Sequence, residues 1–201
     1  MEPASNHSEP MVPEAISDGE CVQRLLKGET DAFEILIYRH QKTIFNLLYR
    51  MLGDYDDAAE VAQEVFLSAY RSLAQFRGAA NFSTWLYRIA INHASTRRRS
   101  LANSKQRNVP LGSIDPVDER QADPINALVQ KDIQHRVQVA LNSLAPADAT
   151  IILLRDMQDV PYEEVAKMLE VPVGTVKSRL HRARQTLKAK LAPYFEDGKL
   201  L

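Results

Sequence analysis

Residues 161–191, PYEEVAKMLEVPVGTVKSRLHRARQTLKAKL, read as a short helix, a four-residue turn and a longer helix. On the longer helix the apolar residues recur at helical spacing and form one stripe, which comprises Val173, Val176, Leu180, Ala183, Leu187 and Leu191. The opposite side carries Ser178, His181, Arg182 and Gln185, flanked by Lys177 and Lys188. No Asp or Glu occurs from residue 171 to residue 194, although the formal net charge of the chain is only −1. This pattern predicts a helix-turn-helix whose second helix presents cations.

The predicted helix-turn-helix favours binding to duplex DNA. A second helix of this kind fits the major groove, where Arg and Lys contact phosphates or guanine, and Ser and Gln hydrogen-bond to bases. A carboxylate on that side would be repelled by phosphate, which accounts for the missing acids. The alternative is a solvated basic helix at the end of a bundle, and the preceding helix and turn weigh against it. Arg179 and Arg184 lie near the edge of the stripe, where either could instead form an ion pair within the domain.

The rest of the chain is also predicted to be helical, because its apolar residues recur at helical spacing and no segment alternates like a strand. Cap residues and stop signals bound the helices, and these are Ser17 with Glu20, Gly28, Thr30 or Asp31, Gly53, Asp54, Asn81 and Pro146. A polar segment with three prolines, residues 100–124, predicts a linker. We therefore expect an all-α fold of two small helical domains, 17–100 and 127–193, joined by a flexible linker at 101–126, with a disordered tail at 1–16 and a second tail at 194–201.

Composition excludes several classes of protein. Charged residues interrupt every apolar run before it reaches the roughly 20 residues of a membrane helix, and the N-terminus lacks the basic start and apolar block of a secretion signal. Cys21 is the only cysteine and the five histidines are scattered, so we expect no metal site and no cofactor. These features indicate a non-enzymatic cytoplasmic protein. Cys21 itself is either a redox trigger or a small buried apolar residue, and its place in a helix favours the second.

The nearly neutral net charge hides two basic segments and one acidic helix. Residues 97–107 hold five Lys or Arg without an acid, and residues 171–194 also lack acids. Residues 54–64, DYDDAAEVAQE, hold five acids without Lys or Arg. The predicted solvent side of this acidic helix carries Asp57, Glu60, Gln63, Glu64 and Leu67. The asymmetry predicts a polyanion as partner of the basic segments and a basic or polar partner for the acidic helix.

Aromatic and basic residues lie close together in residues 76–99, FRGAANFSTWLYRIAINHASTRRR. Aromatic rings that stack on unpaired bases, beside cations that hold the backbone, are a usual means of binding single-stranded nucleic acid. Trp85 also fits a core stripe with Leu86 and Ile89, so we interpret its role as mixed. The loop 76–82, together with Asn92, is the better candidate for a nucleic-acid contact.

Four segments carry a resemblance to a known family: DAFEILIYRH (31–40), DDAAEVAQEVFLSAYRSLAQFRG (56–78), FSTWLYRIAINHA (82–94) and PYEEVAKMLEVPVGTVKSRLHRAR (161–184). In order and spacing they resemble the extracytoplasmic-function (ECF, group 4) sigma factors of bacterial RNA polymerase, of the sigma-E-like type. Any one of these segments is weak evidence for the family, but four of them in this order are specific for it. The resemblance implies a subunit that directs core RNA polymerase to particular promoters and assists melting of their −10 element.

The resemblance also implies three contact surfaces. The largest polymerase subunit would bind the acidic helix at Asp57, Gln63, Glu64 and Leu67. The −10 element, with one base flipped out, would be held by Phe76, Arg77, Asn81, Arg88, Asn92, Arg97, Arg98 and Arg99. The −35 element would be read by Thr175, Lys177, Ser178, His181, Arg182 and Gln185, with this domain resting on the second-largest subunit. Relatives are usually held inactive by an anti-sigma factor, which can keep a sigma factor at the inner membrane face, so such a partner is expected here.

Three positions depart from the family pattern. Asp159, Val160 and Pro161 stand where Gly-Leu-Ser is common, so Asp159 is expected to cap the following helix. Glu170 stands in the turn where Gly is common, and it either strains the turn or lies in a helical conformation. His181 occupies a variable position, so the preferred −35 sequence does not carry over.

Two other functions account for parts of the sequence. A stand-alone helix-turn-helix regulator that binds duplex DNA as a dimer explains 161–191, but it leaves the acidic helix and residues 76–99 without a role. A pure interaction module would dock its basic helix on an acidic protein.

Overall fold

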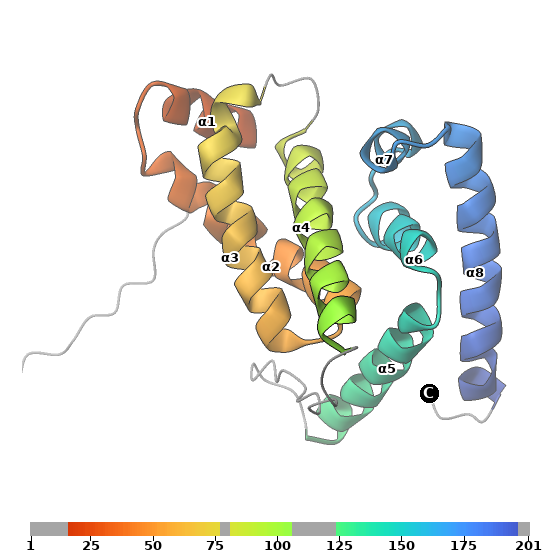
Figure 1. The fold of residues 1–201 in the computed structure, drawn as a ribbon. Helices are drawn as coiled ribbons and strands as arrows, with labels where there is room; N and C mark the ends of the chain where they lie inside the picture. The colour runs from red at the N-terminus through yellow and green to blue at the C-terminus, as the bar shows by residue number, and fades with distance from the viewer. Residues whose placement is uncertain (1–15, 77–80, 106–123, 197–201) are drawn as a thin grey trace, which may run out of the picture.

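The computed structural model describes residues 16–76, 81–105 and 124–196, and over these residues every regular element is a helix (Figure 1). The predicted all-α class is therefore confirmed. The first unit comprises α1 (Asp18–Leu26), α2 (Ala32–Leu52), α3 (Tyr55–Ser72), the 3-10 turn η1 (Leu73–Gln75) and α4 (Phe82–Lys105). The second unit comprises α5 (Pro124–Asn142), α6 (Pro146–Ile152), the π-helical turn η2 (Leu153–Met157), α7 (Tyr162–Leu169) and α8 (Val173–Glu196).

Local signals in the sequence set the ends of the first three helices. The Ser17 hydroxyl accepts from the Glu20 backbone N–H at 3.2 Å, and the Glu20 carboxylate accepts from the Ser17 N–H at 2.8 Å, which completes the predicted capping box. Hydrogen bonds to the Ser17 backbone and hydroxyl lower the pKa of Glu20. Gly53 ends α2 at φ 78°, a left-handed conformation that glycine adopts without steric penalty. Asp54 then caps α3 by accepting from the Asp57 N–H at 2.9 Å.

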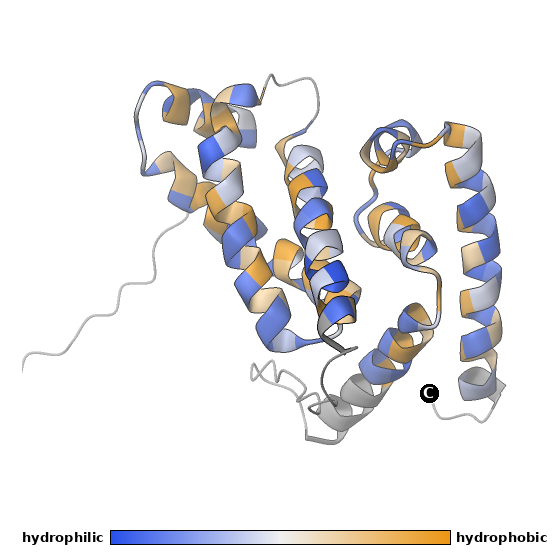
Figure 2. Ribbon diagram, viewed as in Figure 1, coloured by the Kyte–Doolittle hydropathy of each residue, from blue (hydrophilic) through white to orange (hydrophobic). Residues whose placement is uncertain are grey.

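The first unit packs α2, α3 and α4 around an apolar core, with α1 against α2. Each helix contributes buried residues at helical spacing, among them Leu36, Ile44, Leu48, Val61, Val65, Leu86 and Ala90. Figure 2 shows hydrophobic residues of these helices turned toward one another and hydrophilic residues along the outside of α3. One side of α3 and part of α4 therefore remain available to a partner.

In the second unit α6 and α7 both pack against α8. α7 and α8 form the predicted helix-turn-helix, and α6 supports it from the side. Pro146 occupies the first turn of α6, as predicted, because a proline there lacks only an N–H that the helix start leaves unpaired. Val176, Leu180 and Ala183 of the apolar stripe on α8 are buried. This burial fixes which side of α8 faces solvent.

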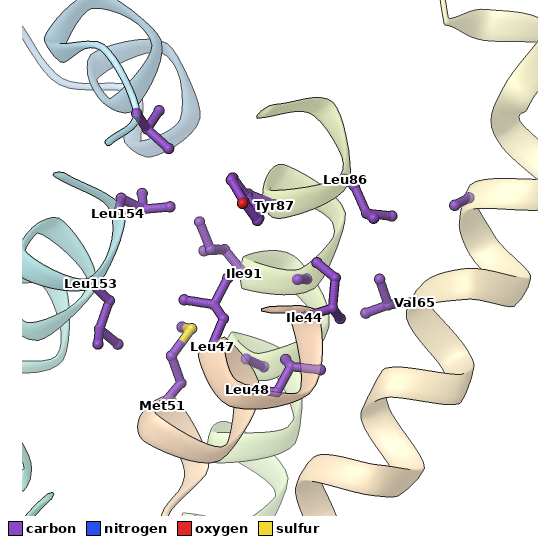
Figure 3. Packing of buried hydrophobic residues seen from close by; sticks show 14 of the residues in the cluster. Ile44, Leu47, Leu48, Met51, Val65, Leu86, Tyr87, Ile91, Leu153 and Leu154 are labelled. Carbon is purple, nitrogen blue, oxygen red and sulfur yellow. The ribbon is translucent and has the colours of Figure 1, made fainter. Parts of the chain in front are cut away.

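The two units share one apolar core. Leu153 and Leu154 of η2 are only 1% and 0% exposed, and they face the first unit across the boundary (Figure 3). The facing residues of the first unit are Leu47, Met51, Tyr87 and Ile91. The two units therefore bury part of their apolar surface against each other.

Two side-chain hydrogen bonds also cross the boundary between the units. The Tyr87 hydroxyl donates to Gln158 Oε1 at 3.0 Å, and burial raises the pKa of this tyrosine. Gln138 Nε2 donates at 3.0 Å to the backbone carbonyl of Arg50, in the last turn of α2. Each bond satisfies a polar group that the shared core removes from water.

Two predicted helix ends differ from the structure. α4 continues to Lys105, into the expected linker, because the sequence has no Pro or Gly between Phe82 and Lys105 that would end the helix. α8 continues through Pro193 to Glu196, past the expected domain end at 193, and the Arg136 guanidinium lies 4.4 Å from the centre of the Tyr194 ring in that last turn. The predicted tails and linker fall largely on 1–15, 106–123 and 197–201, which lie outside the described residues.

The turns around α7 also depart from the expected capping. Pro161, not Asp159, precedes α7, and it supplies no side-chain cap, so the predicted cap at Asp159 is wrong. Asp159 instead adopts φ 51° and forms an ion pair with Arg155 at 3.3 Å. Asp31 likewise precedes α2 without a side-chain cap bond. Glu170 ends α7 at φ 54° and ψ 42°, so the strained alternative for this residue is confirmed.

Replacing Glu170 by glycine should raise the free energy of unfolding by about 0.5–1 kcal/mol. A left-handed conformation costs a residue with a Cβ roughly 1–2 kcal/mol, and glycine avoids this cost. Glycine also loses more backbone entropy on folding than glutamate does, which offsets part of the gain. Chemical denaturation measures the change. Glu170→Ala is the matched control, since it removes the carboxylate and keeps the Cβ. Equal effects of the two substitutions would show that the backbone at this turn is not strained.

Candidate nucleic-acid interface

One face of α8 gathers the residues predicted to contact duplex DNA. Five of them are exposed and Thr175 is half-buried, and the exposed ones are Lys177, Ser178, His181, Arg182 and Gln185. The apolar stripe on the opposite side of α8 packs into the second unit, so the helix turns these polar residues outward. The structure thus places the predicted set on one solvent-facing surface.

Local contacts orient several of these side chains. The Ser178 hydroxyl donates to the Thr175 carbonyl at 3.1 Å, which leaves its oxygen lone pairs to accept from a ligand. His181 and Gln185 are one helical turn apart, and their Nε2 atoms form a hydrogen bond of 3.0 Å. The Lys177 ammonium lies 5.6 Å from the centre of the Tyr162 ring, so α7 steadies a cation of α8.

The two arginines at the edge of the stripe behave differently. Arg184 Nε and Nη2 donate to the two oxygens of Asp156 at 2.9 and 2.5 Å, and this hydrogen bonding raises the pKa of Arg184. The ion pair within the domain, foreseen as an alternative, is therefore present for Arg184. Arg179 lines an open pocket of about 440 Å³ between α8 and the start of α6, together with Arg182 and Asp148.

The acidic helix α3 exposes Glu60, Gln63, Glu64 and Leu67, and Leu67 has 55% of its surface in solvent. Asp57 differs from these, because its side chain is only 15% exposed. Leu67 lies about one turn beyond Glu64, the last acidic residue of α3, so an exposed apolar side chain borders the acidic part of this surface. Three of the four residues predicted to bind polymerase are thus freely accessible.

Arg97 of α4 explains the burial of Asp57. Its Nε and Nη2 donate to Asp57 Oδ1 at 2.8 and 2.5 Å, and Nη2 also donates to Glu60 Oε2 at 2.6 Å. One turn earlier, His93 Nδ1 lies 3.2 Å from Glu64 Oε2. The helical spacing of Asp57, Glu60 and Glu64 places these acids on one side of α3, but only the packing of α4 against α3 brings His93 and Arg97 opposite them.

Five of the other predicted −10 contacts lie on α4 or immediately before it. Asn81, Arg88, Asn92 and Arg99 are exposed, and Arg98 is half-buried. Arg77 lies outside the described residues. Asn81 immediately precedes α4, where its carbonyl accepts from the Trp85 N–H at 3.1 Å. α4 therefore exposes amide and guanidinium groups to solvent, whereas the guanidinium of Arg97 is bound to Asp57 and Glu60.

Three aromatic rings cluster next to Asn81. The ring centres of Phe76 and Trp85 lie 5.3 Å apart, and those of Phe82 and Trp85 lie 5.7 Å apart. Phe82 is 3% exposed, whereas Phe76 and Trp85 are half-buried and pack against the core. The cluster anchors the start of α4, and Phe76 at its rim keeps surface for a ligand.

A polar network beside this cluster has no counterpart among the predictions from sequence. Asp18 accepts from Arg39 Nη1 and lies 2.8 Å from His40 Nε2, and Arg39 Nη2 donates to the Ile16 carbonyl at 2.8 Å. The His40 ring lies 5.4 Å from that of Phe82. The partners are more than 20 residues apart in the chain, so no local pattern could have revealed them.

Cys21 is fully buried in the core, and burial raises the pKa of its thiol. This agrees with the interpretation of Cys21 as a small apolar residue, because a buried, protonated thiol reacts slowly. Within the described ranges, no cluster of three or more His, Cys, Asp or Glu side chains is arranged to hold a metal ion. None of the described helices has the length and apolarity to cross a membrane.

Each of the two units matches a known family of protein domains. The model of Sigma-70 region 2 matches residues 36–104, and that of Sigma-70 region 4 matches residues 134–187. The chain is 33% identical over 187 residues to the RNA polymerase sigma-H factor of Pseudomonas aeruginosa, covering 90% of this chain and 97% of the relative. The ECF RNA polymerase sigma-E factor of Escherichia coli K12 is also 33% identical, over 190 residues, with the same coverage of both chains. The chain belongs to the ECF sigma factors.

Two solved structures share the fold of this sigma factor. They are the sigma factor RpoE in complex with the anti-sigma factor NepR from Bartonella quintana, and CnrH in complex with the cytosolic domain of CnrY. Each gives a TM-score of 0.63, at 22% and 23% identity, covering 81% and 86% of this chain and 98% and 96% of the other. Similarity along nearly the whole chain favours a sigma factor over a stand-alone helix-turn-helix regulator.

Proposed function

We propose that this sigma factor brings core RNA polymerase to its promoters through three surfaces on separate helices. α3 binds the polymerase, the start of α4 with the loop before it captures the −10 element, and α8 reads the −35 element. The observation that carries the proposal is the outward face of α8, which offers Lys177, His181 and Arg182 to solvent in a segment without one carboxylate. Such a face suits the phosphates and base edges of a major groove.

The polymerase surface consists of Gln63, Glu64 and Leu67, with Asp57 at its margin. Leu67 would fill an apolar depression on the largest subunit, while the acids attract basic residues around it and so guide the encounter. The second unit would rest on the second-largest subunit.

The −10 surface combines amides with cations. Asn81 and Asn92 can hydrogen-bond to the edge of a flipped base beside Phe76, and Arg88, Arg98 and Arg99 can hold the strand by its phosphates. Arg77 belongs to the same predicted set. Flipping a base costs a few kcal/mol, which these contacts would offset in the opened promoter.

The −35 surface would read duplex DNA directly. Lys177 and Arg182 can bind phosphate or guanine, and Thr175, Ser178, His181 and Gln185 can hydrogen-bond to base edges. A base contact of this kind discriminates by about 1–3 kcal/mol, so a few of them separate one promoter class from another.

Promoter-dependent transcription in vitro tests the proposed function. Purified protein is mixed with core polymerase and a promoter library, and transcripts are mapped by their 5′ ends. We expect a set of start sites that requires both components and shares two sequence elements upstream. Tight duplex binding without polymerase, and no new start sites, would instead identify a stand-alone regulator.

An anti-sigma factor is the proposed regulator of this protein. The proposal is supported by the structural relative RpoE, which was solved in complex with the anti-sigma factor NepR, and by CnrH, which was solved in complex with the cytosolic domain of CnrY. Such a partner would hold this sigma factor inactive in the cytoplasm or at the inner membrane face. The sigma factor itself would act without catalysis, metal or cofactor, since each surface works by binding alone.

A further inference from the structure

Two neighbouring helices of the first unit are joined by a ladder of polar contacts. α3 presents Asp57, Glu60 and Glu64, and α4 presents His93 and Arg97 opposite them. Arg97 bridges the first two acids with donor–acceptor distances of 2.5–2.8 Å, and His93 contacts the third at 3.2 Å. His93 Nε2 also lies 2.9 Å from the Ser68 hydroxyl, one turn further along α3.

The Arg97 end of this ladder is held firmly. The Arg97 side chain is 32% exposed and that of Asp57 is 15% exposed, so solvent screens their attraction less than it screens a pair at the surface. Hydrogen bonding to Asp57 raises the pKa of Arg97, and the charge of Glu60 adds to this effect. Moving Arg97 away would leave Asp57 half-buried without its counter-charge, which is costly.

The neighbouring arginines are engaged differently. Arg88 and Arg99 are exposed, and Arg99 Nε donates to the Ser95 carbonyl of its own helix at a long 3.4 Å. A phosphate can bind such a side chain at little cost. Arg97 would first have to give up three charge-assisted hydrogen bonds.

We propose that Arg97 is a positioning residue for polymerase binding and not a promoter contact. It fixes the carboxylate of Asp57, at the margin of the polymerase surface, and that of the neighbouring Glu60, so that α3 meets its partner with these groups already oriented. The role rests on the proposed function of α3 as the polymerase surface. It removes Arg97 from the −10 set and leaves Arg88, Arg98 and Arg99 to hold the DNA strand.

Two binding measurements on four proteins separate the roles. The proteins are the wild type, Arg97→Ala, Arg97→Lys and the matched control Arg99→Ala. The first measurement is the Kd for core polymerase by fluorescence titration. The second is the salt dependence of binding between saturated holoenzyme and a forked −10 DNA. We expect Arg97→Ala to weaken core binding about fivefold and to leave the salt slope unchanged, because the coupling lies between neighbouring residues.

The two other variants sharpen this result. Arg97→Lys keeps the charge and should restore part of the core affinity, although lysine cannot bridge two carboxylates in the same way. Arg99→Ala should keep the core affinity and lower the salt slope by about 1, as the loss of one phosphate contact does. Unchanged core affinity with a lowered salt slope for Arg97→Ala would overturn the proposal.

A double-mutant cycle distinguishes positioning from a general loss of stability. If Arg97 acts mainly through Asp57, then Arg97→Ala should weaken core binding less in an Asp57→Asn background than in the wild type, with the remainder due to Glu60. Additive losses would show that Arg97 supports the first unit as a whole, and the positioning role would be wrong. Failure of the wild type itself to bind core polymerase would overturn the proposed function and, with it, this role.

Discussion

Replacing Leu154 by alanine should lower the free energy of unfolding by about 3–5 kcal/mol, among the larger effects of a single substitution. Leu154 is 0% exposed and faces Tyr87 and Ile91 across the boundary between the units (Figure 3). The substitution removes buried methyl groups and leaves a cavity that helices from two directions cannot easily close. Chemical denaturation followed by circular dichroism measures the loss.

Met157 provides the matched control for Leu154. It lies three residues after Leu154 in the same π-helical turn η2 and is 45% exposed, so Met157→Ala should lower the free energy of unfolding by no more than about 0.5 kcal/mol. The shared core also predicts one cooperative transition for the wild type and a tendency toward two transitions in Leu154→Ala. Equal costs for the two substitutions would show that the units do not pack together in solution as they do in Figure 3.

Helix ends and faces were largely predictable from sequence because they depend on neighbours in the chain. The capping box of Ser17 with Glu20, the Gly53 stop and the Asp54 cap each involve residues at most four apart, and all three are confirmed. The outward face of α8 followed from its period alone. The same reasoning failed at Asp159, because the family pattern suggested a cap where the backbone turns left-handed instead.

Contacts between helices were harder to predict from the sequence. Arg97 lies in a run of three arginines that resembles a nucleic-acid contact, and only the register of α4 against α3 reveals that it faces Asp57, 40 residues away. The bond between Tyr87 and Gln158 spans 71 residues. Periodicity identifies which side of a helix is buried but not which helix covers it, so the expected pair of separate domains gave no hint of a shared core.

Reversing the charge of Arg182 should have the largest functional effect. We expect Arg182→Glu to lower initiation at a promoter with an intact −35 element by about 100-fold, since one lost base contact costs about 1–3 kcal/mol and the new carboxylate is also repelled by phosphate. Arg182 is exposed on α8, so the substitution should leave the fold intact. Quantitative run-off transcription measures the change.

Lys167 offers a control with the same change of charge in the same unit. It lies on α7 with its side chain 71% exposed, and it pairs only with Glu164, at 2.7 Å, among the contacts described. Lys167→Glu should therefore keep most of the activity. Both variants should bind core polymerase like the wild type, and both should initiate normally on a template whose −10 region is already open and whose −35 element is absent. If Arg182→Glu lost no more activity than Lys167→Glu on the intact promoter, α8 would not be the surface that reads the −35 element.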